Sequence, residues 1–384
     1  MPPTPPLHIC FVAHEYHEDF PDAEALLEAY HSLTEWCTAL QQNGCKVSAV
    51  VRFKKEDRIQ REGIDYLFVH DRYGPQLTFW QIPKKMHRLV VAQKADVVHA
   101  HNFNKVLQHR DLAKRLAIRQ TPLLLQNHGE TPRYWLRNII QERVFSQINA
   151  FLFCARGQEK IWQEKKIFSL NSPLYYVMEG STHFRKMEHN QSRQSSGLKG
   201  QPVVLWVGHL NDNKDPLTIL SAFDQLLVDY PQAQLYMIYR QADLLNEVKA
   251  KIRASQRLTG QVTLLGEKKR NELVTFYSSA DYFILGSHRE GSGYAALEAI
   301  ACGCIPILTD IYSYRMMTDE GRIGPLWPPG EVNALVQALK KAFAFSIPEK
   351  SEKVQQFFHQ VLSYPAIAKS MISYYQELIE KSSS

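Results

Sequence analysis

Two carboxylates on either side of a glycine-rich turn could bind a phosphorylated sugar. Glu290 is followed by Gly291, Ser292 and Gly293, and Glu298 lies five residues after Gly293. The backbone N–H groups of such a turn, at the start of a helix, favour an anion such as a diphosphate. Glu290 can then accept a hydrogen bond from a sugar hydroxyl, and Glu298 can hold the two hydroxyls of a ribose. The pattern therefore favours binding of a nucleotide sugar.

The elements around this turn are predicted to be a strand, a helix and a second strand. Residues 282–285 and 305–308 are short apolar runs bounded by Gly or Pro, as in buried parallel strands. Residues 294–302 are good helix formers with one face of small side chains. The alternative is an ordinary β–α turn with two solvated acids, and the spacing alone leaves both interpretations open.

A lysine in an earlier turn is the first candidate for a cation that binds the diphosphate. Lys214 follows an apolar run that ends at Gly208, and it precedes Pro216, which predicts the start of a helix. A positive charge is mildly unfavourable near a helix N-terminus, so its presence there favours a functional role. Asp212 and Asp215 flank the lysine and are expected to cap the helix.

The same segments resemble those of a known family, the retaining GT-B glycosyltransferases, and in particular the family-4-like group (glycosyl transferases group 1). The resembling segments are 206–217, 262–266, 276–281, 290–298 and 324–330. The resemblance implies an α/β fold, GT-B, in which two Rossmann-like domains have parallel sheets that face each other across a cleft. It also implies transfer of a hexosyl group from a nucleotide-diphosphate sugar to an acceptor substrate, with retention of configuration.

The resemblance assigns roles to individual residues. Lys214, Glu290 and His128 are the candidate catalytic residues. The candidate donor-binding residues are Gly208, His209, Lys214, Glu290, Gly291, Ser292, Gly293, Tyr294 and Glu298. The sequence has no Asp-x-Asp motif, and Lys214 with a helix N-terminus can replace a divalent ion. We therefore expect no metal and no cofactor, with the nucleotide sugar as donor substrate.

The N-terminal half resembles the family more loosely. One helix is predicted over 26–40, and the predicted strands are 7–13, 45–51, 95–101, 122–129 and 151–155. His14 and Glu15 follow the first strand, where α/β proteins bind ligands, and with Glu179 they are candidates for the acceptor side. His128 ends a predicted strand and matches the family's cleft histidine, although a histidine in this position is often only a loop residue.

Three positions depart from the family pattern. The first β–α turn, 20–24, lacks the usual glycine pair, so the acceptor side is expected to be built differently. His209 stands where the family usually has an arginine, and a neutral imidazole donates one hydrogen bond without a full charge. The segment 239–241 replaces a glycine-rich turn and can supply a cation, Arg240, near the nucleotide.

A length of 384 residues predicts two domains. The first is expected over 1–187, followed by a polar linker at 188–201 and a second domain over 202–364. By resemblance, a terminal helix within 365–384 returns to complete the first domain.

Composition and charge restrict the class of protein. A hydrophobic content of 45% and a charged content of 22% are typical of a soluble globular protein, and no apolar run is long enough for a membrane span. The N-terminus has no secretory signal and the six cysteines have no metal spacing, so a cytoplasmic location is expected. Residues 1–200 carry 27 Lys and Arg against 20 Asp and Glu. This basic half either contacts the inner face of an anionic membrane peripherally or is an ordinary solvated surface.

The expected partners are a nucleotide sugar and an acceptor substrate that is a glycan, a lipid-linked sugar or a small molecule. Nucleic acid is not expected, because the sequence has no recognisable binding module or aromatic platform. Two alternatives to a transferase remain open: a nucleotide-sugar epimerase on the same fold, and a catalytically inactive nucleotide-sugar-binding protein.

Overall fold

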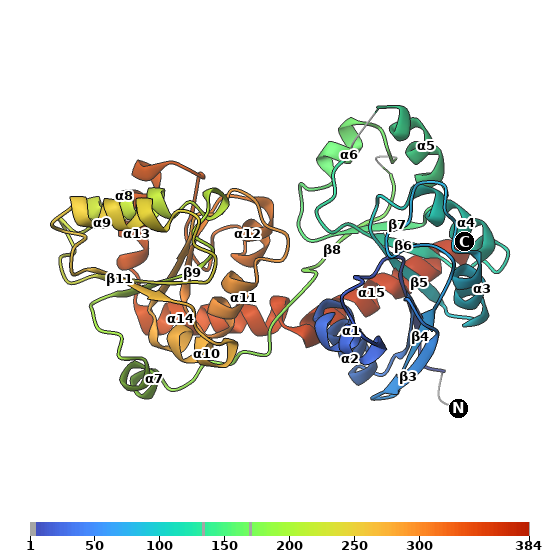
Figure 1. Cartoon of the computed structure of the whole chain (residues 1–384), viewed down its shortest axis with the longest axis horizontal. Helices are drawn as coiled ribbons and strands as arrows, with labels where there is room; N and C mark the ends of the chain where they lie inside the picture. Colours follow the sequence, from blue (N-terminus) through green and yellow to red (C-terminus); the bar gives the residue numbers. More distant parts are fainter. Residues whose placement is uncertain (1–4, 133–134, 169–170, 384) are drawn as a thin grey trace. The chain divides into compact units, whose positions relative to one another are not determined.

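The computed structural model describes residues 5–132, 135–168 and 171–383. Two compact units are formed, one from Met1–Gly180 with Tyr364–Ser384 and the other from Ser181–Ser363. In each unit a largely parallel sheet lies between helices (Figure 1). Both units therefore have the Rossmann-like α/β architecture that was predicted.

The first unit is built on an eight-stranded sheet with the order β3-β4-β2-β1-β5-β6-β7-β8. Neighbouring strands are parallel except β3 and β4, which are antiparallel. The strands are β1 (His8–Ala13), β2 (Lys46–Arg52), β3 (Asp57–Arg61), β4 (Ile64–Val69), β5 (Val97–His101), β6 (Leu123–Gln126), β7 (Ala150–Phe153) and β8 (Leu174–Tyr176). The central strands are buried, as expected for a parallel sheet that is covered on both faces.

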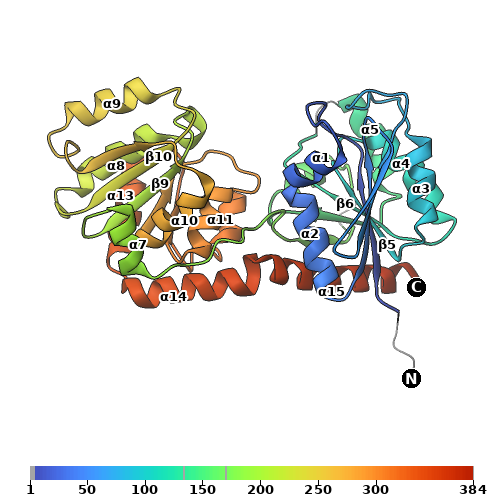
Figure 2. The ribbon, with the colours of Figure 1, turned by 60° about the horizontal axis from the view of Figure 1, so that its bottom comes forward.

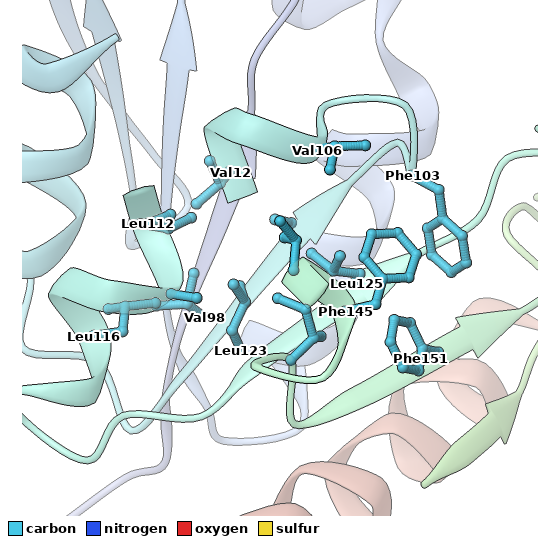
Figure 3. Close-up of a cluster of buried hydrophobic side chains, with 14 of the residues drawn as sticks. Val12, Val98, Phe103, Val106, Leu112, Leu116, Leu123, Leu125, Phe145 and Phe151 are labelled. Atoms are coloured by element: carbon cyan, nitrogen blue, oxygen red, sulfur yellow. The ribbon is translucent and has the colours of Figure 1, made fainter. Parts of the chain in front are cut away.

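Helices cover both faces of this sheet (Figure 2). On one face α2 (His31–Gln42) packs against α15 (Tyr364–Ser383), and α1 (Ala23–Ala29) precedes α2. On the other face lie α3 (Lys84–Ala92), α4 (Val106–Ala117) and α5 (Trp135–Phe145), and α6 (Lys160–Glu164) follows β7. Aromatic and aliphatic side chains of β5 to β7 and of α4 form the core on this second face (Figure 3). The C-terminal helix thus belongs to the first unit.

The single helix predicted over 26–40 is wrong in one respect. The segment forms two helices, because the backbone of Tyr30 leaves the helical region at φ −87° and ψ 57°. The predicted apolar face is buried except at Tyr30, which is half-buried. Both helices present that face to the sheet, so the predicted pattern of buried apolar residues is correct in spite of the break.

The second unit has a fully parallel six-stranded sheet with the order β11-β10-β9-β12-β13-β14. The strands are β9 (Val203–Gly208), β10 (Gln234–Tyr239), β11 (Val262–Gly266), β12 (Tyr282–Leu285), β13 (Ile305–Thr309) and β14 (Leu326–Trp327). In chain order this is the 3-2-1-4-5-6 arrangement of doubly wound folds, in which ligands bind where the order reverses. Here the order reverses between β9 and β12.

Helices also cover both faces of the second sheet. The helices are α7 (His189–Ser196), α8 (Pro216–Leu226), α9 (Leu245–Ala254), α10 (Arg270–Ser279), α11 (Tyr294–Ala301), α12 (Tyr312–Met317), α13 (Val332–Phe343) and α14 (Ile347–Phe357). A 3-10 turn, η1 (Asp212–Lys214), precedes α8, and a π-turn, η2 (Phe358–Leu362), follows α14. The helix α8 packs with α9 and α13, whereas α10 packs with α7 and α11.

Many residues of 188–201 are exposed, as the polar composition predicted, but the segment is not a linker between the units. It contains α7, which Glu188 caps through hydrogen bonds from the amides of Asn190 and Gln191 at 3.0 and 2.6 Å. The helix packs on α10, and Arg193 donates to Asp281 at 2.8 Å. The units instead divide between residues 180 and 181, seven residues before the predicted boundary. Polar side chains here bond to the unit's surface, which composition alone does not reveal.

Among the described residues, no helix combines the length and the apolar character that crossing a bilayer requires.

Candidate functional site

The loops that carry Lys214 and Glu290 lie side by side at the switch point of the second sheet. Lys214 follows β9 and Glu290 follows β12, and these neighbouring parallel strands end at the same edge. Asn213 joins the loops: its backbone oxygen accepts from the His288 amide at 2.8 Å, and its side chain exchanges two hydrogen bonds of 3.1 Å with the backbone of Arg289. The predicted proximity of the two loops is confirmed.

Glu290 receives several donors in this arrangement. It forms an ion pair with Lys214 Nζ, and the exposed fractions of the two side chains are 12% and 16%. The same carboxylate oxygen accepts from Ser287 Oγ at 2.8 Å and from the Tyr314 hydroxyl at 3.3 Å. Burial, followed by the charge of Glu290, raises the pKa of the fully buried Tyr314 well above its usual range. The alternative of a solvated acid at position 290 is therefore wrong.

Local backbone geometry explains why the lysine loop approaches so closely. Asp215 adopts the left-handed conformation, at φ 43°, and its side chain caps α8 by accepting from the Thr218 amide at 3.2 Å. Gly286 follows β12, and a Cβ there would lie 3.1 Å from the Lys214 backbone oxygen and 3.3 Å from that of Asp215. A side chain at position 286 would therefore push the two loops apart.

The glycine turn before α11 depends on Gly293 for a similar reason. Gly293 is the N-cap residue, with φ 54°, and a Cβ there would lie 3.0 Å from Met317 Cε and 3.1 Å from Tyr314 Cε1. The first amides of a helix have no acceptor within the helix and can bind an anion. The segment 291–294 thus presents a helix N-terminus beside the Lys214–Glu290 pair.

Glu298 lies on α11 and is also buried, with 8% of its side chain exposed. The Tyr277 hydroxyl donates to Glu298 Oε2 at 3.2 Å, and Arg270 lies 3.7 Å from Oε1. Burial raises the pKa of Glu298, and Arg270 and Tyr277 oppose this shift. This carboxylate is therefore held in place by α10, and the alternative of a solvated acid is wrong here too.

His209, the predicted hydrogen-bond donor to the phosphate, follows β9. The last residue of β9, Gly208, packs against the Trp206 ring. Among the described residues, buried Nδ1 of His209 has no hydrogen-bond partner. The next residue, Leu210, donates from its amide to the Gln241 backbone oxygen at 2.9 Å. The segment 239–241 therefore lies beside the His209 loop, as its position after β10 predicts.

The remaining predicted residues gather in the first unit. His14, Glu15, His128 and Glu179 line one cavity of about 420 Å³ beyond the carboxyl ends of β1, β5 and β6. This is the switch point of the first sheet, because the strand order reverses between β1 and β5. The predicted site residues therefore form two groups, one in each unit.

His128 is the centre of a hydrogen-bond network. Its Nδ1 lies 3.0 Å from Glu179 Oε2, its Nε2 lies 2.8 Å from His101 Nδ1, and its amide donates to Glu130 at 2.7 Å. Burial acts to lower the pKa of His128, but the hydrogen bond and charge of Glu179, with the charge of Glu130, outweigh it and raise the pKa. Burial lowers the pKa of His101 well below its usual range. When His128 is protonated, it donates to both neighbours.

We expect the imidazole of His128 to titrate above 6.5, its ordinary value, and the Glu179→Gln variant to titrate lower. The pair stabilises the fold fully below pH 6.5, and this contribution is lost as the pH rises through the higher folded-state pKa. Histidine NMR titration measures both values. Glu56→Gln, which breaks a surface ion pair with Lys85, is the control and should leave the His128 titration unchanged. An unchanged titration in Glu179→Gln would contradict the network.

Sequence reasoning missed the residues that support these side chains. His14 Nε2 lies 3.0 Å from His87 Nε2, and His87 Nδ1 donates to Asp111 Oδ2 at 2.7 Å. Glu15 forms an ion pair with Lys105 and accepts from Asn102 at 3.3 Å. These partners come from α3, from α4 and from the turn before α4, and no sequence motif connects them to the first strand. In the second unit, Gly286 was the one signal available, because a glycine directly after a strand indicates close backbone approach.

Comparison with known proteins agrees with this geometry. The family of glycosyl transferases group 1 matches residues 188–357, and the glycosyl transferase 4-like family matches residues 25–143. The chain belongs to the family-4-like GT-B glycosyltransferases. Its fold class, with two parallel-sheet α/β domains, is that of GT-B enzymes.

Curated relatives of the chain differ in the acceptors that their names state. A GDP-mannose:cellobiosyl-diphosphopolyprenol alpha-mannosyltransferase of Xanthomonas oryzae is 24% identical over 254 residues, which are 64% of this chain and 65% of the relative. A D-inositol 3-phosphate glycosyltransferase of Rhodococcus erythropolis is 26% identical, over 52% of this chain and 46% of the relative. The chain therefore spans less than two thirds of the length of these relatives.

A solved structure of similar fold is the sucrose-phosphate synthase of Thermosynechococcus elongatus. It superposes with a TM-score of 0.66 over 98% of this chain and 100% of that protein, at 18% sequence identity. At this identity the similarity supports the fold alone. Within the part of the chain that the structure describes, no three His, Cys, Asp or Glu side chains are arranged to hold a metal ion.

Proposed function

We propose that this chain transfers a hexosyl group from a nucleoside-diphosphate sugar to a hydroxyl of an acceptor substrate, with retention of configuration. The observation that carries this proposal is the pairing of Lys214 with Glu290 beside the N-terminus of α11. Family membership supports it, and so does the position of the pair at the switch point.

For each part of the donor substrate, the second unit has residues that could bind it. The ammonium of Lys214 and the amides of 291–294, including those of Ser292 and Tyr294, would hold the diphosphate. Gly208 allows the backbone to pass close to it, and His209 would donate one further hydrogen bond. Glu290 would accept from a hydroxyl of the hexose, because its carboxylate is already fixed by Ser287 and Tyr314. The proposal includes no metal or cofactor, since these groups supply the positive potential that the diphosphate needs.

The reaction would proceed by cleavage of the bond between the hexose anomeric carbon and the diphosphate oxygen. Fixed donors stabilise the charge that develops on the leaving diphosphate, and they need no reorganisation during the reaction. The acceptor hydroxyl forms a new bond to the anomeric carbon on the same face, and its proton passes to the departing diphosphate. His128 would contact the transferred sugar, and the first unit would hold the acceptor substrate.

Analysis of products tests this function. The chain is incubated with UDP- and GDP-hexoses, with and without sugar acceptors, and the anomeric proton of each product is observed by NMR. The proposal predicts a new glycoside with the donor's anomeric configuration, formed only with an acceptor. An isomerised nucleotide sugar without an acceptor would identify an epimerase. Nucleotide binding without any product would identify a non-catalytic binding protein.

Glu298→Ala is expected to weaken nucleoside-diphosphate binding by about tenfold, since it removes a charged acceptor of ribose hydroxyls. The loss should be specific for the ribose: the wild type should prefer the ribonucleotide over the 2′-deoxyribonucleotide, and the variant should not. Isothermal titration with both nucleotides measures this. Glu352→Ala, on the exposed surface of α14, is the control. Equal discrimination by wild type and Glu298→Ala would remove Glu298 from the ribose site.

We also propose a peripheral contact between the first unit and anionic lipid headgroups. The packed helices α3 and α4 expose Lys84, Arg88, Arg110 and Lys114, and none of these forms an ion pair with a described residue. Trp80, four residues before the start of α3, is 76% exposed. Cations beside an exposed tryptophan suit a membrane surface. Co-sedimentation with phosphatidylglycerol vesicles, and not with phosphatidylcholine vesicles, would support this contact.

A further inference from the structure

The cavity in the first unit allows the class of acceptor substrate to be inferred, an inference that rests on the proposed function. The cavity opens beyond the carboxyl ends of β1, β5 and β6 and has a volume of about 420 Å³, within the range of small-molecule sites. Relatives act on acceptors as different as a lipid-linked disaccharide and an inositol phosphate, so family membership alone does not identify the class. The charges of the residues that line the cavity distinguish between these classes of acceptor.

The described lining residues contain three carboxylates, Glu15, Glu130 and Glu179, and a single Lys or Arg, Lys105. Lys105 forms an ion pair with Glu15 and donates to the Leu77 backbone oxygen at 3.2 Å. It is nearly buried, with 11% of its side chain exposed. The one fixed cation of the cavity is therefore already neutralised and held in place.

Four histidines line the cavity, His14, His17, His101 and His128, and two of them, His14 and His101, add no charge. His87 donates from Nδ1 to Asp111, so a neutral His87 accepts at Nε2, and His14 must donate to it from its own Nε2. Among the described residues, Nδ1 of the buried His14 then has no partner. Burial lowers the pKa of His14 and His101 well below the usual range, so both are neutral.

The pKa of His128 is raised instead, and when this imidazole is protonated its charge is compensated by Glu179 at 3.0 Å. Lys214 of the second unit is also ion-paired, but there the amides of a helix N-terminus add to it, whereas this cavity has a third carboxylate, Glu130, beside its two ion pairs. The charged groups that line the cavity are instead mainly hydrogen-bond acceptors: the carboxylates of Glu15, Glu130 and Glu179. These groups suit a ligand that presents hydroxyl protons.

The cavity lining also contains apolar and aromatic residues. Tyr30, Leu33 and Trp36 line the cavity from α2 and the turn before α2. Tyr30 belongs to an aromatic group with His17 and Phe20, at ring-centroid distances of 6.3 and 5.7 Å. Apolar and aromatic walls with a few fixed polar groups are typical of sites for uncharged organic ligands. A sugar ring has both an apolar face and hydroxyl groups. The apolar face can contact the apolar residues, and the hydroxyl groups can donate to the carboxylates.

We propose that this cavity binds an unphosphorylated sugar ring as the acceptor, through hydroxyl groups that donate to Glu15, Glu130 and Glu179. A phosphate group on that ring is disfavoured, because it would meet three carboxylates while the single Lys or Arg of the described lining, Lys105, is already paired with Glu15. The hydrogen-bonded series Asp111–His87–His14 is a positioning element that keeps the lining residue His14 uncharged. A phosphate elsewhere on a larger acceptor, outside the cavity, is compatible with this assignment.

Saturation-transfer NMR with a bound nucleoside diphosphate tests the acceptor class. Cellobiose and methyl α-mannoside are compared with glucose 6-phosphate, mannose 6-phosphate and inositol 1-phosphate as probes. Binding of an unphosphorylated sugar is expected to be at least about tenfold tighter than binding of its phosphate, because like charges repel in a partly desolvated site. Preference for a phosphorylated probe, or binding of no unphosphorylated sugar, would overturn the proposal.

A charge variant separates this proposal from general loss of structure. Glu15→Gln removes one carboxylate and releases Lys105, so the preference against sugar phosphates should fall by about tenfold. Glu24→Gln, which breaks a surface ion pair with Arg61 in the same unit, should keep the wild-type preference. An unchanged preference in Glu15→Gln would contradict the electrostatic argument. Binding of the nucleoside diphosphate, measured in the same samples, reports on the donor site and therefore tests the proposed function separately.

Discussion

Lys214→Ala is expected to lower kcat/KM for the nucleotide sugar by about 10²–10³-fold, the effect of removing one preorganised donor to a developing negative charge. Lys214 is the cation that the fold brings to Glu290, through a 3-10 turn and a capped helix. Its ammonium is mostly buried, so water does not replace it well in the variant. Release of the nucleoside diphosphate in a coupled assay measures the change.

The control for this variant is another ion-paired lysine of the same unit. Lys340 on α13 pairs with Asp229 at 2.6 Å on the surface. Lys340→Ala should change the rate less than about twofold, because surface pairs contribute little. Lys214→Arg restores the charge but not the geometry, and it should recover only part of the activity. Wild-type turnover by Lys214→Ala would remove this residue from the proposed role.

Glu290→Ala is expected to have the second largest effect, a loss of about 10–100-fold in kcat/KM, the range for a hydrogen bond to a charged group. The side chain would contact a hydroxyl of the transferred hexose. It also accepts from buried Tyr314 and Ser287, so truncation removes the acceptor of Ser287 and leaves Tyr314 only Ser287 Oγ, at 3.1 Å. Glu290→Gln keeps the shape and an acceptor oxygen, and it should retain more activity.

A deoxygenated donor separates the two contributions. If Glu290 contacts one hexose hydroxyl, a donor that lacks that hydroxyl should react equally slowly with wild type and Glu290→Gln. The losses from the variant and from the deoxy-donor then do not add, as for groups that contact each other. A panel of 2-, 3-, 4- and 6-deoxy donors identifies the hydroxyl. Strictly additive losses with every donor would contradict direct contact.

The sequence predicted the features that depend on neighbours along the chain. The apolar runs before Gly208 and before Gly286 became β9 and β12, and the segment from Tyr294 became α11. Asp215 and Pro216 predicted the start of α8, and Asp215 caps this helix. Parallel strands end at a common edge, so the proximity of Lys214 and Glu290 followed from the motif order.

The features that depend on distant parts of the chain were not predictable in this way. Tyr314 reaches Glu290 from α12, and His87 and Asp111 support His14 from two other helices. Such contacts arise from tertiary packing and leave no periodic signal in the sequence. The break at Tyr30 interrupts a helix whose apolar pattern is continuous, so the pattern alone predicted one element. The polar composition of α7 likewise did not predict a helix, because the residues it packs against lie on α10.

The central claim is that the diphosphate lies between Lys214 and the N-terminus of α11. Isothermal titration of a nucleoside diphosphate and its monophosphate, against wild type and Lys214→Ala, tests this most directly. The wild type should bind the diphosphate more tightly than the monophosphate by about tenfold or more, and Lys214→Ala should lose most of this difference. Equal affinities for both nucleotides in the wild type, or an undiminished difference in the variant, would contradict the claim.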